Sequence, residues 1–288
     1  MSFPPQPEPA TWIAAFNRAT DEVRAYLATI TTSADRLEET GERGEGGDRT
    51  LTLDAEAETL IFAELDRLHA DGARFTALSE ERGMVDYGSR DTLVVIDPID
   101  GSMNAKRGMP SHAVSIAVAV GPNVVEDGTM ADVTCGLVAD LGVDERWTAI
   151  RGEGAFLDGE SFVAPAEERL TSEGLLELVA IESAHPRHVL ASGDALLEHV
   201  HRLRATGAIA ISLCQVAAGR VDGMASLWRC RAVDAAAGQL IVRESGGVVS
   251  FGDLDDPLNS PLDLVPREPV VAARTAAGLA RVARLPHQ

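Results

Sequence analysis

The chain has 288 residues, a formal net charge of −20 and a hydrophobic content of 45%, enough apolar material for one large core or two modest ones. The acidic balance disfavours nucleic acid as a partner, because phosphate backbones are bound by basic patches. It does not disfavour small anions, since bound metal ions can reverse the local field in an acidic protein.

The sequence shows neither the pattern of a membrane-spanning segment nor that of a signal peptide. No apolar run approaches the roughly 18 residues needed to cross a bilayer, and the first residues lack the basic and apolar regions of a signal peptide. Three scattered cysteines, Cys135, Cys214 and Cys230, form neither a disulfide framework nor a CxxC metal pattern. We therefore expect a cytoplasmic protein without membrane contact.

The first third of the sequence predicts two long helices before the first clear strand. Residues 1–10 are rich in proline, and we expect them to be frayed. From residue 11 to residue 30, apolar residues recur at spacings of three, four and seven, which is typical of an amphipathic helix. A second helix is expected to open at residues 53–58. Residues 39–50 are polar and rich in glycine, which predicts a mobile loop.

The remaining elements alternate between strands and helices. Strands are predicted from apolar runs at residues 75–78, 93–96, 113–120, 134–139, 147–151, 178–183, 222–227, 248–251 and 269–272, with a hairpin tip at 152–159. Helices are predicted at about 190–205, 209–218, 233–245 and 274–284, and irregular segments at 79–90 and 164–177. The pattern favours an α+β fold of stacked helix and sheet layers, with one domain at 11–288 and sub-halves at about 11–160 and 161–288.

Residues 92–104 are the most informative about function. The apolar run at 93–96 is typical of a strand buried on both faces, and it ends at two carboxylates, Asp97 and Asp100. Pro98, between them, removes a backbone donor. The result is a patch rich in oxygen acceptors, which favours a cation.

The Ile99 carbonyl adds a further acceptor to this patch, but the residues that follow it favour an anion. Gly101 allows a sharp turn, and a helix starting near Ser102 would direct free N–H groups to the same point. A cation-favouring patch beside an anion-favouring helix start is what a metal-bound phosphate requires.

Further acidic residues lie at chain bends next to apolar runs: Asp54, the pair Glu80 and Glu81, and Asp234. Mg²⁺ takes oxygen ligands from a few carboxylates and from substrate phosphate. Two such ions about 3.5–4 Å apart can stabilise the attacking and leaving oxygens of a phosphoryl displacement. Taken alone, each of these residues is more often a helix N-cap or a solvated charge than a metal ligand.

The segment from Asp97 to Asn104 resembles the signature of the inositol monophosphatase family, which are lithium-sensitive, Mg²⁺-dependent sugar phosphatases. The resemblance runs from about residue 12 to residue 275. Similar segments follow in the order of the family at 51–58, 79–81, 151–156, 204–210, 216–222 and 233–247. Two departures, Val233 before Asp234 and the residues after Asn104, resemble the archaeal-type branch, which acts on inositol monophosphate and fructose 1,6-bisphosphate.

By position, the resemblance implies a set of site residues. Two or three Mg²⁺ ions would be held by Glu80, Asp97, Asp100, Asp234 and the Ile99 carbonyl. Asp54, Glu80 and Ser102, where the family usually has threonine, would act in proton transfer and in positioning the water. Asp100, Gly101, Ser102 and Arg204 would contact substrate, and Arg204, Arg229 and Arg231 are either contacts for a second phosphate or sugar hydroxyls or surface arginines. The loop at 39–50 would complete a further metal position.

The resemblance also implies an αβαβα fold, a homodimer, and hydrolysis of a phosphomonoester of a small polyol or sugar. Leu227 lies where relatives place a polar substrate contact, which leaves the substrate open. The alternatives are hydrolysis of 3′-phosphoadenosine 5′-phosphate or histidinol phosphate, and a non-catalytic role as a partner protein, as in bacterial relatives that act with the transcription machinery.

Overall fold

Two long helices, α1 (Pro9–Thr29) and α3 (Thr52–Ala70), open the chain and pack against each other. The structure, a computed structural model, describes residues 7–30, 39–45, 49–163 and 165–286. Proline in the first turn of α1 needs no hydrogen-bond acceptor there, and the helix buries Trp12 and Phe16 on its apolar face. Both helices predicted from the apolar spacing are therefore confirmed.

Between these helices lies a two-stranded antiparallel hairpin, β1 (Glu39–Arg43) and β2 (Arg49–Leu51). The prediction of a loop at 39–50 was wrong for these strands, and residues 46–48 lie outside the described residues. Backbone hydrogen bonds can pair two polar segments without the apolar pattern from which strands are predicted. The Glu45 N–H donates to the Glu81 carbonyl at 3.2 Å, so the segment after β1 reaches the turn that carries Glu80.

The larger sheet has eight strands in the spatial order β10-β9-β8-β7-β6-β5-β3-β4. Their bounds are β3 (Thr76–Ser79), β4 (Gly83–Asp86), β5 (Thr92–Asp100), β6 (Ala113–Val120), β7 (Val133–Asp140), β8 (Glu145–Ile150), β9 (Gly154–Leu157) and β10 (Glu160–Phe162). Neighbours are antiparallel except for β3 and β5, which run parallel. The predicted loop at 79–90 was wrong at β4, because a four-residue edge strand carries too little apolar alternation to be recognised.

The second sheet has five strands in the order β12-β11-β13-β15-β14. Their bounds are β11 (Leu176–Glu182), β12 (Val200–Arg204), β13 (Gly223–Ser226), β14 (Val248–Phe251) and β15 (Val270–Ala273). The helix predicted at about 190–205 was wrong in its last part: α6 (Pro186–Ala191) and α7 (Gly193–His199) are followed by β12. Four of the five residues of β12 are exposed at the sheet edge, which removes the alternation typical of a strand.

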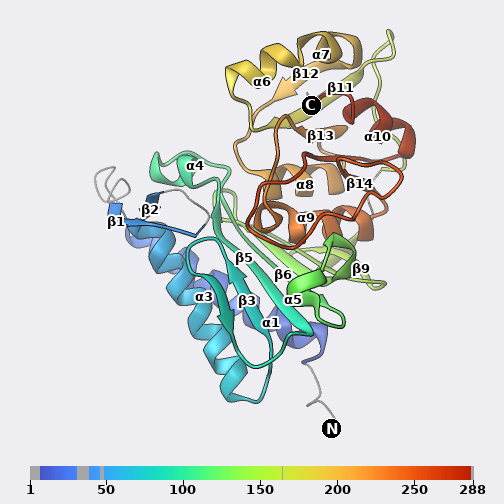
Figure 1. The fold of residues 1–288 in the computed structure, drawn as a ribbon. Coiled ribbons are helices and arrows are strands. Elements are labelled where there is room, and N and C mark those ends of the chain that lie inside the picture. The colour runs from blue at the N-terminus through green and yellow to red at the C-terminus, as the bar shows by residue number, and fades with distance from the viewer. Residues whose placement is uncertain (1–6, 31–38, 46–48, 164, 287–288) are drawn as a thin grey trace.

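Helices α8 (Ile209–Ala217) and α9 (Ala232–Glu244) lie between the two sheets (Figure 1). Helices α1 and α3 cover the outer face of the first sheet, while α7 and α10 (Ala276–Val282) pack on the outer face of the second. Three hydrophobic clusters correspond to these contacts. The order helix, sheet, helix, sheet, helix is the predicted αβαβα arrangement.

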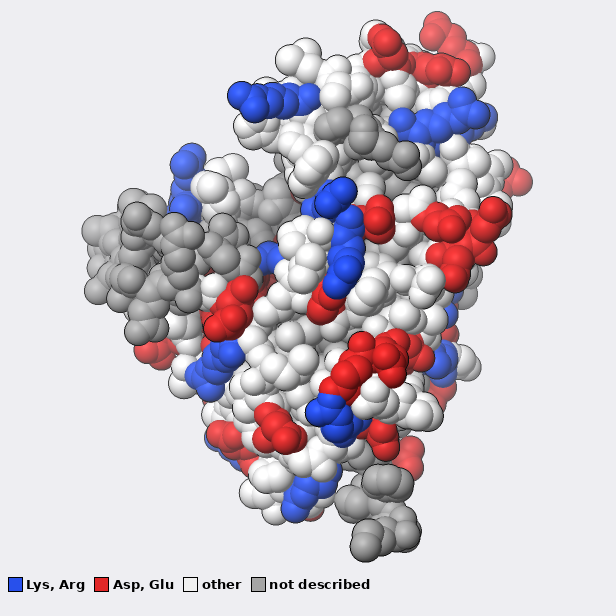
Figure 2. Space-filling model, in the orientation of Figure 1, with Lys and Arg blue, Asp and Glu red and all other residues white. Residues whose placement is uncertain are grey.

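Shorter helical segments complete the chain: α4 (Ser102–Lys106), α5 (Val124–Asp127) and the 3-10 helix Met130–Asp132. Within the described ranges, none of the helices is long and apolar enough to span a membrane. On the face shown in Figure 2, acidic and basic side chains are interspersed in small groups.

Candidate metal and phosphate site

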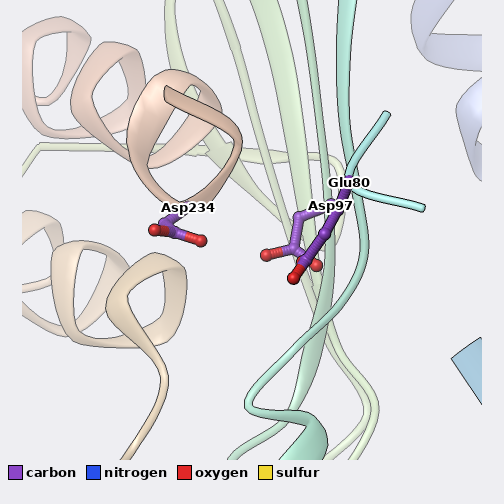
Figure 3. Close-up of side chains that lie close together, drawn as sticks. All are labelled: Glu80, Asp97 and Asp234. Carbon is purple, nitrogen blue, oxygen red and sulfur yellow. The ribbon is translucent and has the colours of Figure 1, made fainter. Parts of the chain in front are cut away.

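Three carboxylates converge where α9 packs against the first sheet. Glu80 follows β3, Asp97 lies in β5, and Asp234 lies in the first turn of α9. One ligand oxygen from each lies within 4.8 Å of the others (Figure 3). The structure therefore brings together residues from three separate parts of the sequence.

Strand pairing explains why Glu80 meets Asp97. The parallel register pairs Ser79 with Ile96, and the Glu80 N–H donates to the Ile96 carbonyl at 3.3 Å. The residues that follow this pair, Glu80 and Asp97, therefore occur at the same level of two neighbouring strands. Asp234 joins them because α9 packs across β5, β6 and β7.

Burial raises the pKa of each carboxyl group on the first-sheet side of the site. The pKa of Glu80 is raised to about 7, chiefly by burial, with Arg231 opposing the shift and Asp234 adding to it. The pKa of Asp97 is raised well above its ordinary value by burial and by its neighbours Glu80 and Asp100. Carboxylates held together in this way repel one another unless a cation lies between them.

The donor set fits a hard divalent cation. All three ligand atoms are carboxylate oxygens, the ligands that Mg²⁺ and Ca²⁺ prefer. Two oxygens bound to one Mg²⁺ at about 2.1 Å are at most about 4.2 Å apart. Since the oxygens of Glu80, Asp97 and Asp234 lie within 4.8 Å of one another, a small contraction suffices to coordinate one ion.

Asp100 lies beside this group and also serves a structural contact. Its Oδ2 accepts a hydrogen bond from the Ala210 backbone N–H at 2.7 Å, in the first turn of α8. Burial and the nearby Asp234 raise the pKa of Asp100 well above its ordinary value. The β5–β6 register shifts between Asp97 and Asp100, and the Ile99 N–H donates to Asp97 Oδ1 at 3.0 Å. Such bulges redirect side chains next to functional sites.

Gly101 makes the turn that follows. Its φ of 84° lies in the left-handed region, and an added Cβ would come within 2.7 Å of the Ser111 carbonyl oxygen. Only glycine fits both the backbone conformation and the space. α4 begins immediately afterwards at Ser102, as the sequence predicted.

The remaining predicted site residues lie in different surroundings. Asp54 is buried in the first turn of α3. Arg204 is exposed at the end of β12, where it donates to the Leu203 carbonyl at 2.8 Å. It borders a cavity of about 360 Å³ whose lining includes Ser111 and Thr206 but none of the three converging carboxylates.

A family comparison decides the class of protein. The model of the inositol monophosphatase family matches residues 10–286. The chain belongs to the inositol monophosphatase family. Membership confirms the resemblance found in the sequence and places the chain among the phosphoric monoester hydrolases.

Known proteins agree with this assignment to the inositol monophosphatase family. A fructose-1,6-bisphosphatase/inositol-1-monophosphatase of Methanothermobacter thermautotrophicus is 32% identical over 224 residues, which cover 75% of this chain and 77% of that protein. A Nus factor SuhB of Haemophilus influenzae is 33% identical over 205 residues, covering 70% and 71%. The structure of an inositol monophosphatase from Anabaena superposes with a TM-score of 0.70 at 22% identity, over 96% of this chain and 95% of that chain, which shows the fold.

Arg231 enters the site in a way that the sequence analysis missed. With two other arginines, it was expected to be either a contact for a second phosphate or sugar hydroxyls or a surface arginine, whereas its guanidinium contacts the carboxylates of Glu80 and Asp234. Its position three residues before Asp234 was an available signal, because the residue that caps a helix start and the third residue of that helix commonly contact each other in a capping box. Arg229 lies elsewhere, over the Trp228 ring at 5.7 Å.

Glu182, at the end of β11, is a second residue that the sequence analysis missed. Its carboxylate accepts hydrogen bonds from the Thr206 hydroxyl at 2.6 Å, the Ser212 hydroxyl at 2.6 Å and the Gly207 N–H at 2.9 Å. Burial raises its pKa, which these hydrogen bonds partly offset. Since a Cβ on Gly101 would approach the Gly207 carbonyl, this loop forms one wall of the turn that carries the site.

Proposed function

We propose that the protein is a Mg²⁺-dependent phosphatase that hydrolyses a phosphomonoester of a small polyol or sugar, inositol 1-phosphate or fructose 1,6-bisphosphate among them. The observation that carries this proposal is the convergence of the carboxylates of Glu80, which is half-buried, and of Asp97 and Asp234, which are buried. Similarity to the Methanothermobacter protein, which is named for both activities, supports the choice of substrates.

The carboxylates would hold two or three Mg²⁺ ions. Glu80, Asp97 and Asp234 supply the converging oxygens, with Asp100 and the Ile99 carbonyl as further ligands. When bound, the ions supply an acidified water and stabilisation of negative charge on the leaving oxygen. The protein in turn fixes the positions of these ligands through strand pairing and through α9.

The turn after β5 would bind the phosphate. The backbone N–H groups of Gly101 and Ser102 lie at the start of α4, where no earlier carbonyl of the helix is available to accept from them. The Asp54 carboxylate would accept the proton of the attacking water through the Ser102 hydroxyl, which would take that proton and pass its own to Asp54, and Glu80 would help to orient the water. Asp100 and Arg204 would contact the rest of the substrate.

Release of inorganic phosphate from a substrate panel tests the proposal. Inositol 1-phosphate, fructose 1,6-bisphosphate, histidinol phosphate and 3′-phosphoadenosine 5′-phosphate would each be incubated with Mg²⁺ and with chelator. We expect turnover of one of the first two that requires Mg²⁺ and falls at least about a hundredfold in Asp97→Asn. Asp71→Asn, at an exposed aspartate after α3, is the control and should match wild type. Absence of phosphate release from every ester would contradict the proposal.

A role as a partner protein is the second candidate, because several relatives bear the name Nus factor SuhB. Physical considerations favour catalysis: the like charges of Asp97, which is buried, and its neighbour Glu80, which is half-buried, reduce stability, and a protein used only for docking has no need of them. The same Asp97→Asn variant separates the two roles in cells. Loss of phosphatase activity with retention of the biological role would favour the partner protein.

Lithium inhibition, homodimer formation and a cytoplasmic location stay predictions from the family resemblance and the sequence pattern. Phosphate release in increasing LiCl tests the first, sedimentation equilibrium of the purified chain tests the second, and fractionation of cells tests the third.

A further inference from the structure

Arg231 contributes the positive charge that lies among the converging carboxylates. Its Nη1 donates to Glu80 Oε1 in a short contact, and its Nη2 donates to Asp234 Oδ1 at 2.9 Å. Its backbone N–H donates to Asp234 Oδ2 at 2.8 Å, which fixes the start of α9. One side chain thus bridges the turn after β3 and the first turn of α9.

The surroundings keep this guanidinium charged. Burial alone would lower the pKa of Arg231, but the carboxylates of Asp234 and Glu80 more than offset this and raise it. The side chain is only 17% exposed. The positive charge of Arg231 therefore reduces the repulsion between the carboxylates of Glu80 and Asp234, as a bound cation would.

The contacts of Arg231 coincide with those that a metal ion needs. Glu80 and Asp234 are two of the three residues whose oxygens converge within 4.8 Å. Oxygen lone pairs that accept from a guanidinium are not available to a cation in the same direction, and two positive charges at this distance repel. An ion between Glu80 and Asp234 would therefore compete with Arg231 for the oxygens that it bridges and would be repelled by its charge.

We propose that Arg231 is a built-in counter-cation, which occupies the acidic group of the metal-free protein and must be displaced from Glu80 or Asp234 when a divalent cation binds. The inference rests on the metal site of the proposed function. It gives Arg231 two effects of opposite sign: it stabilises the metal-free fold and it weakens metal binding. Metal binding is thereby coupled to movement of the segment before α9.

Metal titration of Arg231→Gln tests this coupling. Binding of Mg²⁺, and of Mn²⁺ as a probe, would be measured by calorimetry in the wild type and the variant, without substrate. Removal of a unit charge close to a divalent ion is expected to lower the Kd by about tenfold or more. In chelator, the thermal midpoint of the variant should fall below that of wild type, and the gap should close at saturating metal.

Arg229→Gln is the matched control, because Arg229 is an exposed arginine two residues away that lies over Trp228. It should leave both the Kd and the midpoint unchanged. If Arg231→Gln does not fold, Arg231→Lys takes its place: it keeps the charge but lacks the planar fork that bridges two carboxylates, so we expect metal binding about threefold tighter than wild type.

Three results would overturn the inference. An unchanged metal Kd in the variant that folds would mean that Arg231 does not compete. Weaker binding of inorganic phosphate with an unchanged metal Kd would make Arg231 a substrate contact instead. Absence of metal binding by wild type and Arg229→Gln would contradict the metal site itself, and the proposed function would fail with it.

Discussion

Asp100 in the first sheet accepts a hydrogen bond at 2.7 Å from the backbone of Ala210, in the helix that lies between the two sheets. The two residues are 110 positions apart in the chain. A predicted metal ligand and substrate contact is therefore also the residue that attaches the end of β5 to α8. Two effects of substituting Asp100 therefore have to be distinguished: loss of the negative charge, and loss of the hydrogen bond that attaches β5 to α8.

Asp100→Asn and Asp100→Ala make that separation. Asparagine keeps an oxygen that can accept from Ala210, so its free energy of unfolding should stay within about 1 kcal/mol of wild type, whereas alanine should lose about 1–3 kcal/mol. Both remove the charge, and both should lower the rate of phosphate release by about a hundredfold. Urea unfolding in chelator and phosphate release measure the two effects. Equal destabilisation by both substitutions would contradict the role of the hydrogen bond.

Gly101→Ala is expected to distort the turn that carries the proposed phosphate contacts. The positive φ and the approach of a Cβ to the Ser111 carbonyl, at 2.7 Å, should together reduce the free energy of unfolding by about 1–3 kcal/mol. The displaced backbone should also lower kcat by about tenfold or more. Gly72→Ala is the control, because Gly72 also has a positive φ but has open space around it. If both variants kept full activity, the turn would not contact the phosphate.

The sequence indicated the elements whose signals are local. The apolar run of β5, its two carboxylates and Gly101 are neighbours in the chain, so their strand, turn and helix start were predictable together. Long helices with regular apolar spacing, such as α1 and α3, were predictable for the same reason. Short or exposed strands such as β4 and β12 carry too few apolar residues to give a period.

Relationships between distant segments were beyond the sequence pattern. Glu80 and Asp97 meet because of a parallel register that no single segment encodes. In the sequence, Glu182 is an ordinary charged residue at the end of a strand, and only the fold brings the Thr206 hydroxyl within hydrogen-bond distance of it. In the sequence, Arg231 is one of several nearby arginines, and only the packing of α9 against the first sheet brings its side chain to Glu80.

Glu182→Gln is expected to weaken the loop that lies against Gly101. The carboxylate accepts from Thr206, Ser212 and the Gly207 N–H, and a glutamine amide would present a donor to at least one of these groups. We expect the free energy of unfolding to fall by about 2–3 kcal/mol, measured by urea unfolding. Glu177→Gln, at an exposed position of the same strand, should change it by less than about 0.5 kcal/mol.

The raised pKa of Glu80 predicts how the stability of the metal-free protein depends on pH. The folded state holds a proton on Glu80 up to about pH 7, whereas the unfolded chain releases it near its ordinary value of 4.5. The folded state thus binds more protons in this window, so the free energy of unfolding should fall as pH rises, by on the order of 2 kcal/mol between pH 5 and pH 8.

Urea unfolding in chelator measures this fall in the free energy of unfolding, and Glu80→Gln should reduce it. With saturating Mg²⁺ the fall should shrink or reverse, because a bound cation favours the deprotonated carboxylates. A metal-free protein that gains stability over this range would show that Glu80 is not held protonated by its burial.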